Sequence, residues 1–136
     1  MANLNDSLAQ LMTVDGAMTA AVVDSSSGMV LGSIGSGVDI ELAAAGNTEV
    51  VRAKLKTMKS LNLNDQIDDM LITLGKQYHI IRPVAKQEGL FVYIVLDKAR
   101  ANLKRAQDTV TDLKKGLRPE EIDQILARIS QAEAEV

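Results

Sequence analysis

The sequence predicts a single α/β domain of the α+β kind: a five-stranded antiparallel sheet with helices on both faces, plus a C-terminal helix. Three observations predict it. The expected elements follow the order helix, two strands, helix, three strands, helix. Two strand-like runs, 17–23 and 90–96, are almost wholly apolar, which is typical of strands in the middle of a sheet. Tight turns join the other strands to their neighbours as hairpins, which predicts the strand order 2-1-5-4-3.

The composition limits the classes of function. The chain has 136 residues, of which 46% are hydrophobic and 2% aromatic, and its formal net charge is −3. Single-strand binders use aromatic rings for stacking and duplex binders use a basic surface, so we expect no nucleic-acid partner. The absence of Cys excludes disulfides and thiolate metal sites. The longest apolar run, 90–96, is too short to span a bilayer, so we expect a cytoplasmic protein with no membrane partner.

A short amphipathic helix and a hairpin begin the chain. Four apolar residues recur at helical spacing and would share one face: Leu4, Leu8, Leu11 and Met12. Asn5 or Asp6 is the expected N-cap, because a short polar side chain can accept hydrogen bonds from the first helical N–H groups. Strands at 17–23 and 29–34 follow, and the Asp-, Ser- and Gly-rich turn 24–28 joins them.

The longest predicted helix, 39–61, has one apolar face more than a surface helix needs. One stripe is typical of a face packed on a core: Ala44, Thr48, Val51, Leu55 and Met58. A second stripe consists mostly of small residues: Ala43, Gly46, Val50, Ala53 and Thr57. Glycine inside a helix costs about 1 kcal/mol relative to alanine, so Gly46 indicates a packing reason. Either the helix is sunk deep in a monomer or this stripe is an oligomer seam, and we favour the seam.

Three strands and two helices complete the expected fold. The strands are 66–74, 78–84 and 90–96, and the first carries Asp68 and Asp69 near its start, as befits an edge strand. A helix after Asp97 keeps a helical apolar period: Ala99, Leu103, Ala106, Val110 and Leu113. Gly116 would end it, and Pro119 would open a final amphipathic helix. We therefore expect a domain over residues 1–114 and a helical extension over 115–136.

Several short patterns resemble a roadblock domain. They are Val14-Asp15-Gly16-Ala17, the strand Ala21-Val22-Val23-Asp24 with Gly28, Ile72-Thr73-Leu74, Tyr78-His79-Ile80-Ile81, and Leu90 to Asp97 followed by Ala101-Asn102-Leu103. The resemblance covers roughly residues 4–113 and includes the element order αββαβββα. It implies a roadblock/profilin-like fold. The family includes dynein light chains and bacterial regulators of Ras-like GTPases.

The resemblance also implies a homodimer, in which the second helices pack together and the third strands join two sheets into one. The candidate interface residues are Ala43, Gly46, Val50, Ala53 and Thr57 from the helix, and Ile67, Asp69, Leu71 and Thr73 from the strand. Members of the family act as platforms for a small Ras-like GTPase or another protein. Two alternatives without a GTPase stay open: a structural or sensory subunit of a larger complex, and a small-molecule-binding domain.

We predict no catalytic, cofactor-binding or metal-ligating residue. The glycine-rich stretch 32–37 lacks the Lys-Ser/Thr of a phosphate loop, and Asp39 follows it. His79 is the one histidine, and a hydrogen-bonded structural role is expected for it on a strand face shared with Ile81. The nearby acidic residues lack EF-hand spacing, so a solvated turn or edge explains them better: Asp65, Asp68 and Asp69.

Two arginines and the last helix complete the candidates. Arg52 or Arg82 could act on a bound GTPase as an arginine finger does, but nothing singles out either, and we expect both to be surface ion-pair partners. The last helix either docks on its own domain or presents three isoleucines to a partner, with self-docking favoured: Ile122, Ile125 and Ile129. Its acidic residues outnumber its basic ones, which disfavours a membrane-surface role.

Overall fold

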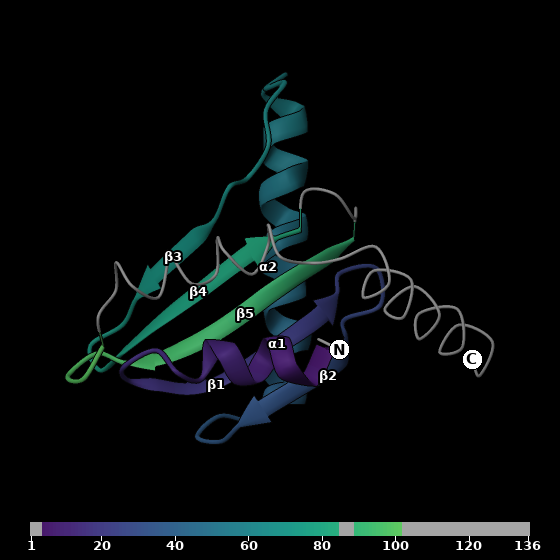
Figure 1. The fold of residues 1–136 in the computed structure, drawn as a ribbon. Helices are drawn as coiled ribbons and strands as arrows, with labels where there is room; N and C mark the ends of the chain where they lie inside the picture. The colour runs from purple at the N-terminus through teal and green to yellow at the C-terminus, as the bar shows by residue number, and fades with distance from the viewer. Residues whose placement is uncertain (1–3, 85–88, 102–136) are drawn as a thin grey trace.

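The computed structural model describes residues 4–84 and 89–101, and their arrangement is the predicted one (Figure 1). The elements are α1 (Leu4–Leu11), β1 (Ala17–Asp24), β2 (Met29–Gly35), α2 (Ile40–Ser60), β3 (Met70–Thr73), β4 (Gln77–Pro83) and β5 (Leu90–Asp97). The strands form one antiparallel sheet in the order β2-β1-β5-β4-β3. Of the helix predicted after Asp97, only residues 98–101 are described: residues 98–100 form a turn, in which the Asp97 carboxylate accepts from the N–H of Ala99 at 3.1 Å. The rest of that helix, the boundary near 114 and the extension 115–136 lie outside the described residues.

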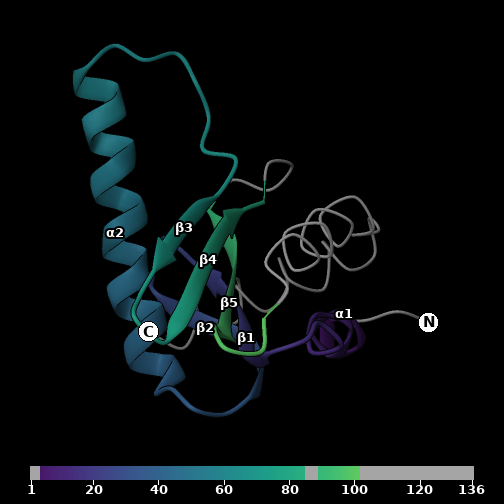
Figure 2. The same cartoon turned by 90° about the vertical axis from the view of Figure 1, so that its left-hand side faces the viewer.

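A helix covers each face of the sheet (Figure 2). On one face, Leu8 and Leu11 of α1 pack in a cluster with Ile94 of β5. On the other face, Ala44 and Val51 of α2 pack in a second cluster with six strand residues: Ala21, Val23, Ile81, Phe91, Tyr93 and Val95. Successive strand residues point to opposite faces, so the central strand β5 contributes to both clusters. This double burial is the reason that its sequence is so uniformly apolar.

Polar side chains define the first turn of the chain and the start of α2, but not the start of α1. α1 already includes Leu4, so Asn5 and Asp6 lie inside the helix, and the prediction that one of them is its N-cap was wrong. The negative charge of Asp6 still interacts favourably with the positive end of the helix dipole. The turn 24–28 forms as predicted, because the Asp24 carboxylate accepts hydrogen bonds from the backbone N and Oγ of Ser26 at 3.0 and 2.7 Å. Asp39 caps α2 by accepting from the N–H of Leu42 at 3.2 Å.

Gly16 ties the start of β1 to the end of β5. Its φ is +85°, and a Cβ added there would lie 2.8 Å from the Cα of Ala101. Its carbonyl accepts a hydrogen bond from the N–H of Asp97 at 2.7 Å. Both the backbone conformation and the close approach therefore require glycine at this point of the Val14-Asp15-Gly16-Ala17 pattern.

α2 projects well beyond the strands (Figures 1 and 2). Its predicted core stripe is buried at Ala44, Thr48, Val51 and Met58. Leu55 is an exception, because 49% of it is exposed, and the prediction was wrong at this position. It lines a cavity described below and is therefore not enclosed by the core. Within the described part of the chain, no helix is long and apolar enough to cross a membrane.

β3 is shorter than the strand predicted over 66–74. It comprises Met70–Thr73 and pairs with β4, with Met70 opposite Ile81. If the register of Met70 with Ile81 continued, Asp69 and Asp68 would lie opposite Arg82 and Pro83, where β4 ends, and the residues before Asp68 would have no part of β4 opposite them. Pro83 has no N–H to donate, which also limits pairing at this end. The prediction failed here because the length of a strand depends on its partner as well as on its own residues.

Candidate functional site

The second stripe of α2 is largely exposed. Ala43 is half-buried, whereas Gly46, Val50, Ala53 and Thr57 are exposed. A Cβ added at Gly46 would meet no heavy atom within 4 Å. Nothing in the described residues therefore requires glycine at this position, although glycine weakens the helix by about 1 kcal/mol relative to alanine.

Side-chain hydrogen bonds show which way this stripe faces. On one flank of α2, Asn47 is hydrogen-bonded to the hydroxyl of Tyr93, which bonds His79 on β4. On the other flank, Arg52 donates to the carbonyl of Ser26 in the β1–β2 turn. At about 100° per residue, Asn47 lies between the core stripe and the second stripe. The second stripe therefore faces the side of the sheet that ends in β4 and β3.

β3 is the edge strand of the sheet on that side, and no other described strand pairs with its outer side. Leu71, Ile72, Thr73 and Leu74 are all exposed there. An exposed strand edge with apolar side chains is a template for pairing with another strand. We name the second stripe and this edge together the α2–β3 surface, which comprises Ala43, Gly46, Val50, Ala53, Thr57, Leu71, Ile72, Thr73 and Leu74.

The other two predicted interface residues, Ile67 and Asp69, are half-buried. The Asp69 carboxylate accepts a hydrogen bond from Arg82 at 2.9 Å, and the Arg82 side chain is only 12% exposed. The ion pair predicted for Arg82 is therefore present, but it is partly buried and not on the surface. Arg52 differs from the prediction, because its described bond is to a carbonyl oxygen and not to a carboxylate.

A chain of hydrogen-bonded side chains lies beneath this flank of α2. His79 Nε2 is 2.9 Å from Gln77 Oε1, and His79 Nδ1 is 2.8 Å from the Tyr93 hydroxyl oxygen. Because Oε1 can only accept, Nε2 carries the hydrogen, and Nδ1 accepts from the Tyr93 O–H. The oxygen of Tyr93 can then accept from Asn47. His79 thus has the structural role that the sequence predicts.

Sequence patterns did not predict that Asn47 and Tyr93 belong to this chain of bonds. The available signal was a tyrosine inside an otherwise apolar run, 90–96, since a buried phenol needs a hydrogen-bond partner. Burial raises the pKa of Tyr93, and the hydrogen bond from Asn47 opposes that rise. Burial also lowers the pKa of His79, which keeps its ring neutral at pH 7.

We expect the stability of the fold to fall with acid through His79. Its pKa in the folded chain lies below the ordinary value of 6.5, so the unfolded chain takes up the proton first as the pH falls. The contribution of the neutral ring is complete above pH 6.5 and is lost as the pH falls through the lowered pKa. Thermal unfolding between pH 7.5 and 5.0 should show a decline in Tm that is smaller in His79→Gln. Equal declines in the two proteins would exclude His79 as the cause.

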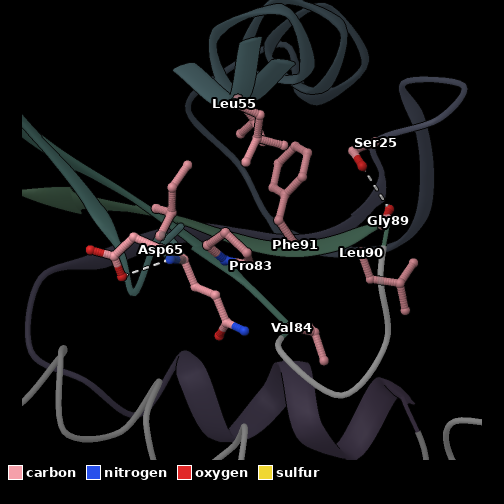
Figure 3. A pocket seen from close by; sticks show the side chains of 11 residues that line it. Ser25, Leu55, Asp65, Pro83, Val84, Gly89, Leu90 and Phe91 are labelled. Carbon is pink, nitrogen blue, oxygen red and sulfur yellow. Dashed lines mark hydrogen bonds between the residues drawn. The ribbon is translucent and has the colours of Figure 1, made fainter. Parts of the chain in front are cut away.

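A cavity of about 340 Å³ opens below the C-terminal half of α2 (Figure 3). Leu55 and Phe91 point toward each other in it, one from the helix and one from β5. The other lining residues come from α2, the segment before β3 and the strand ends: Ser25, Val51, Asp65, Gln66, Ile67, Pro83, Val84, Gly89 and Leu90. Of the described residues that line the cavity, Asp65 alone is charged, so the cavity is mainly an apolar space.

The described residues that were considered as catalytic, metal-ligating or phosphate-binding candidates do not form a reactive site. In residues 4–84 and 89–101, no group of three or more His, Asp or Glu side chains could hold a metal ion. Asp65 accepts from the N–H of Gln66 at 2.8 Å. The glycine-rich stretch 32–37 closes β2 and leads to the Asp39 cap, which places a carboxylate where a phosphate loop would bind its ligand. The three candidate partner-binding residues lie outside the described residues: Ile122, Ile125 and Ile129.

Comparison with known proteins identifies the fold. No protein-family model matches the chain, and no curated protein matches it by sequence. A Roadblock/LC7 domain from Streptomyces avermitilis superposes with a TM-score of 0.75 at 12% identity, over 89% of this chain and 99% of that one. The gliding protein MglB from Thermus thermophilus gives a TM-score of 0.64 at 16% identity, over 82% and 87% of the two chains.

MglB from Myxococcus xanthus gives a similar result, with a TM-score of 0.63 at 16% identity, over 85% of this chain and all of that one. The chain therefore has the roadblock fold. The resemblance in its sequence is confirmed at the level of the fold.

Proposed function

We propose that the chain forms a homodimer and acts as a non-catalytic, cytoplasmic protein-binding module that regulates or scaffolds a small Ras-like GTPase. The observation that carries the proposal is the exposed α2–β3 surface, in which Gly46 has no described neighbour to explain it. The roadblock fold supports the proposal, because it agrees with the sequence resemblance to roadblock domains. That resemblance implies both a homodimer and a platform for a GTPase. One solved structure of similar fold is described as MglB with a tetrameric arrangement, with a TM-score of 0.63 at 16% identity.

The second stripe is self-complementary about Val50. Ala43 lies seven residues before Val50 and Thr57 seven after it, while Gly46 and Ala53 lie four before and three after. In an antiparallel pair of α2 helices with a two-fold axis at Val50, small residues would therefore oppose small residues. Such a pairing is isologous, and small side chains at the contact shorten the distance between helix axes.

The stretch before β3 fits the same dimer. The sequence predicts a strand from residue 66, whereas pairing with β4 extends only over Met70–Thr73. The edge of a second copy would offer hydrogen bonds to the outer side of this segment, as in β-augmentation. We therefore expect the strand to lengthen toward its predicted start when the dimer forms.

Gly46→Ala separates the stability of one chain from the affinity between two chains. The added methyl meets open space and removes the glycine penalty, so the free energy of unfolding of the monomer should rise by about 1 kcal/mol. The same methyl would hold two helices apart at the seam and should raise the dimer Kd. Urea denaturation at protein concentrations below the Kd measures the free energy of unfolding of the monomer. Sedimentation equilibrium measures the dimer Kd.

Ala45→Gly is the matched control for this experiment, because Ala45 is an exposed neighbour outside the second stripe. It should lower the stability of the monomer by about 1 kcal/mol and leave the Kd unchanged. If Gly46→Ala strengthens both the fold and the dimer, the seam lies elsewhere.

The GTPase partner is tested by binding that depends on the nucleotide. Ras-like GTPases of the host, loaded with GDP or with a non-hydrolysable GTP analogue, are passed over the immobilised chain. We expect retention of a GTPase in one nucleotide state, and a change in its rate of GTP hydrolysis would distinguish regulation from scaffolding. If the chain dimerises but retains no GTPase, the structural or sensory-subunit alternative replaces the proposal.

A further inference from the structure

The C-terminal half of α2 is strongly basic. Residues 50–61 contain no acidic residue and four basic ones, all exposed: Arg52, Lys54, Lys56 and Lys59. None of the four forms an ion pair with a carboxylate of the described residues. In a chain whose formal net charge is −3, this concentration of positive charge provides a site for an acidic segment.

The same half of the helix borders the apolar cavity. Leu55 is 49% exposed at that cavity, although it belongs to the core stripe. Arg52 and Lys59 lie three residues before and four residues after Leu55, so they neighbour it on the helix surface. On the helix side of the opening, positive charge therefore lies next to Leu55, while the interior of the cavity is mainly apolar. An amphipathic segment with aliphatic and acidic side chains would satisfy both features.

We propose that residues 119–136 of the same chain dock on this opening. Their aliphatic residues recur at helical spacing: Ile122, Ile125, Leu126 and Ile129. Their five acidic residues and one basic residue, Arg128, give a net charge of −4: Glu120, Glu121, Asp123, Glu133 and Glu135. This charge balances the +4 of residues 50–61. Arg128 is available as a counterion for Asp65 on the opposite wall of the cavity.

The chain is long enough for this contact. Ala101, the last described residue, follows the end of β5, which is far from the cavity. Residues 102–118 connect Ala101 to the docking segment 119–136. β5 has 8 residues and so spans about 26 Å. The 17 connecting residues cover about 26 Å as a helix and more than about 50 Å when extended. The segment can therefore return along the sheet to the end at which β5 starts and the cavity opens.

Docking of this segment would cover the basic end of α2 and so control the access of other acidic partners to it. Leu55 and the second stripe lie on nearly opposite sides of the helix at about 100° per residue. The contact therefore goes beyond the proposed dimer and does not depend on it.

Disulfide trapping tests the contact in the full chain, which contains no native Cys. We expect the pair Lys59→Cys with Glu121→Cys to form an intramolecular disulfide under mild oxidation, seen on a non-reducing gel and by mass spectrometry. The control pair, Glu41→Cys with Glu121→Cys, uses the same flank at the other end of α2 and should form far less. Equal yields from the two pairs, or bridges only between chains, would overturn the proposal.

Charge reversal provides a second measurement. In the Lys59→Cys/Glu121→Cys chain, Arg52→Glu with Lys56→Glu should slow the trapping about tenfold, because two ion pairs become repulsive. Adding Glu120→Lys and Asp123→Lys should restore the rate, with circular dichroism confirming an unchanged fold throughout. The pairing of these charges would be contradicted if the trapping rate were unchanged by Arg52→Glu with Lys56→Glu. It would also be contradicted if Glu120→Lys with Asp123→Lys did not restore the rate.

Discussion

Val50→Asp should convert the proposed dimer into a monomer while leaving the chain folded. Val50 is 42% exposed on the second stripe, so a carboxylate there stays hydrated in a single chain. At a two-fold axis through Val50, two carboxylates would instead face each other and lose water. Burying unpaired charge costs about 3–5 kcal/mol, so the dimer Kd should rise by at least about a hundredfold. Light scattering after gel filtration measures the mass, and circular dichroism measures the fold.

Val50→Ala provides the control for the charge. It removes apolar contact at the seam without adding a carboxylate, so it should weaken the dimer far less than Val50→Asp does. A wild-type chain that is monomeric at all accessible concentrations would count against the seam, as would a Val50→Asp chain that dimerises unchanged.

The order of the strands could be predicted because burial leaves a direct mark on a strand's residues. Tyr93 apart, 90–96 contains no polar residue, which is typical of a strand covered on both faces. The hairpin turns then leave a single consistent arrangement. The edge strand was harder, because the same residues at 66–69 can pair or stay unpaired according to what lies beside them.

The candidate site shows the same limit. Helical periodicity predicts which residues share a face, and it correctly separated the core stripe from the second stripe. It does not predict where a cavity opens between the helix and the sheet, so it placed Leu55 in the core although that side chain lines such a cavity, whereas Met58 further along the same stripe is buried. The bonds that join Asn47, Tyr93 and His79 depend on how α2 is set over β4 and β5, which no local pattern contains.

The same substitution one residue further along α2 should unfold the protein. Val51 is 3% exposed and belongs to the cluster that includes Val23 and Phe91. Aspartate there would place a carboxylate among apolar side chains and would also leave a gap where the second methyl group of valine was. A buried charge without a partner costs more than about 4 kcal/mol, against a typical total stability of about 5–15 kcal/mol. Urea denaturation should show this loss, or the variant should be insoluble.

Two further measurements test whether the loss of stability in Val51→Asp comes from burial of its carboxylate on the core side of α2. Val51→Ala should cost much less than Val51→Asp, since it adds no charge. If Val51→Asp stays soluble, it should recover stability as the pH falls, because burial raises the pKa of its carboxyl and the neutral acid is cheaper to bury. A Val51→Asp chain as stable as Val50→Asp would mean that α2 does not pack on the sheet through this side. Adjacent valines about 100° apart on one helix thus report separately on the core and on the seam.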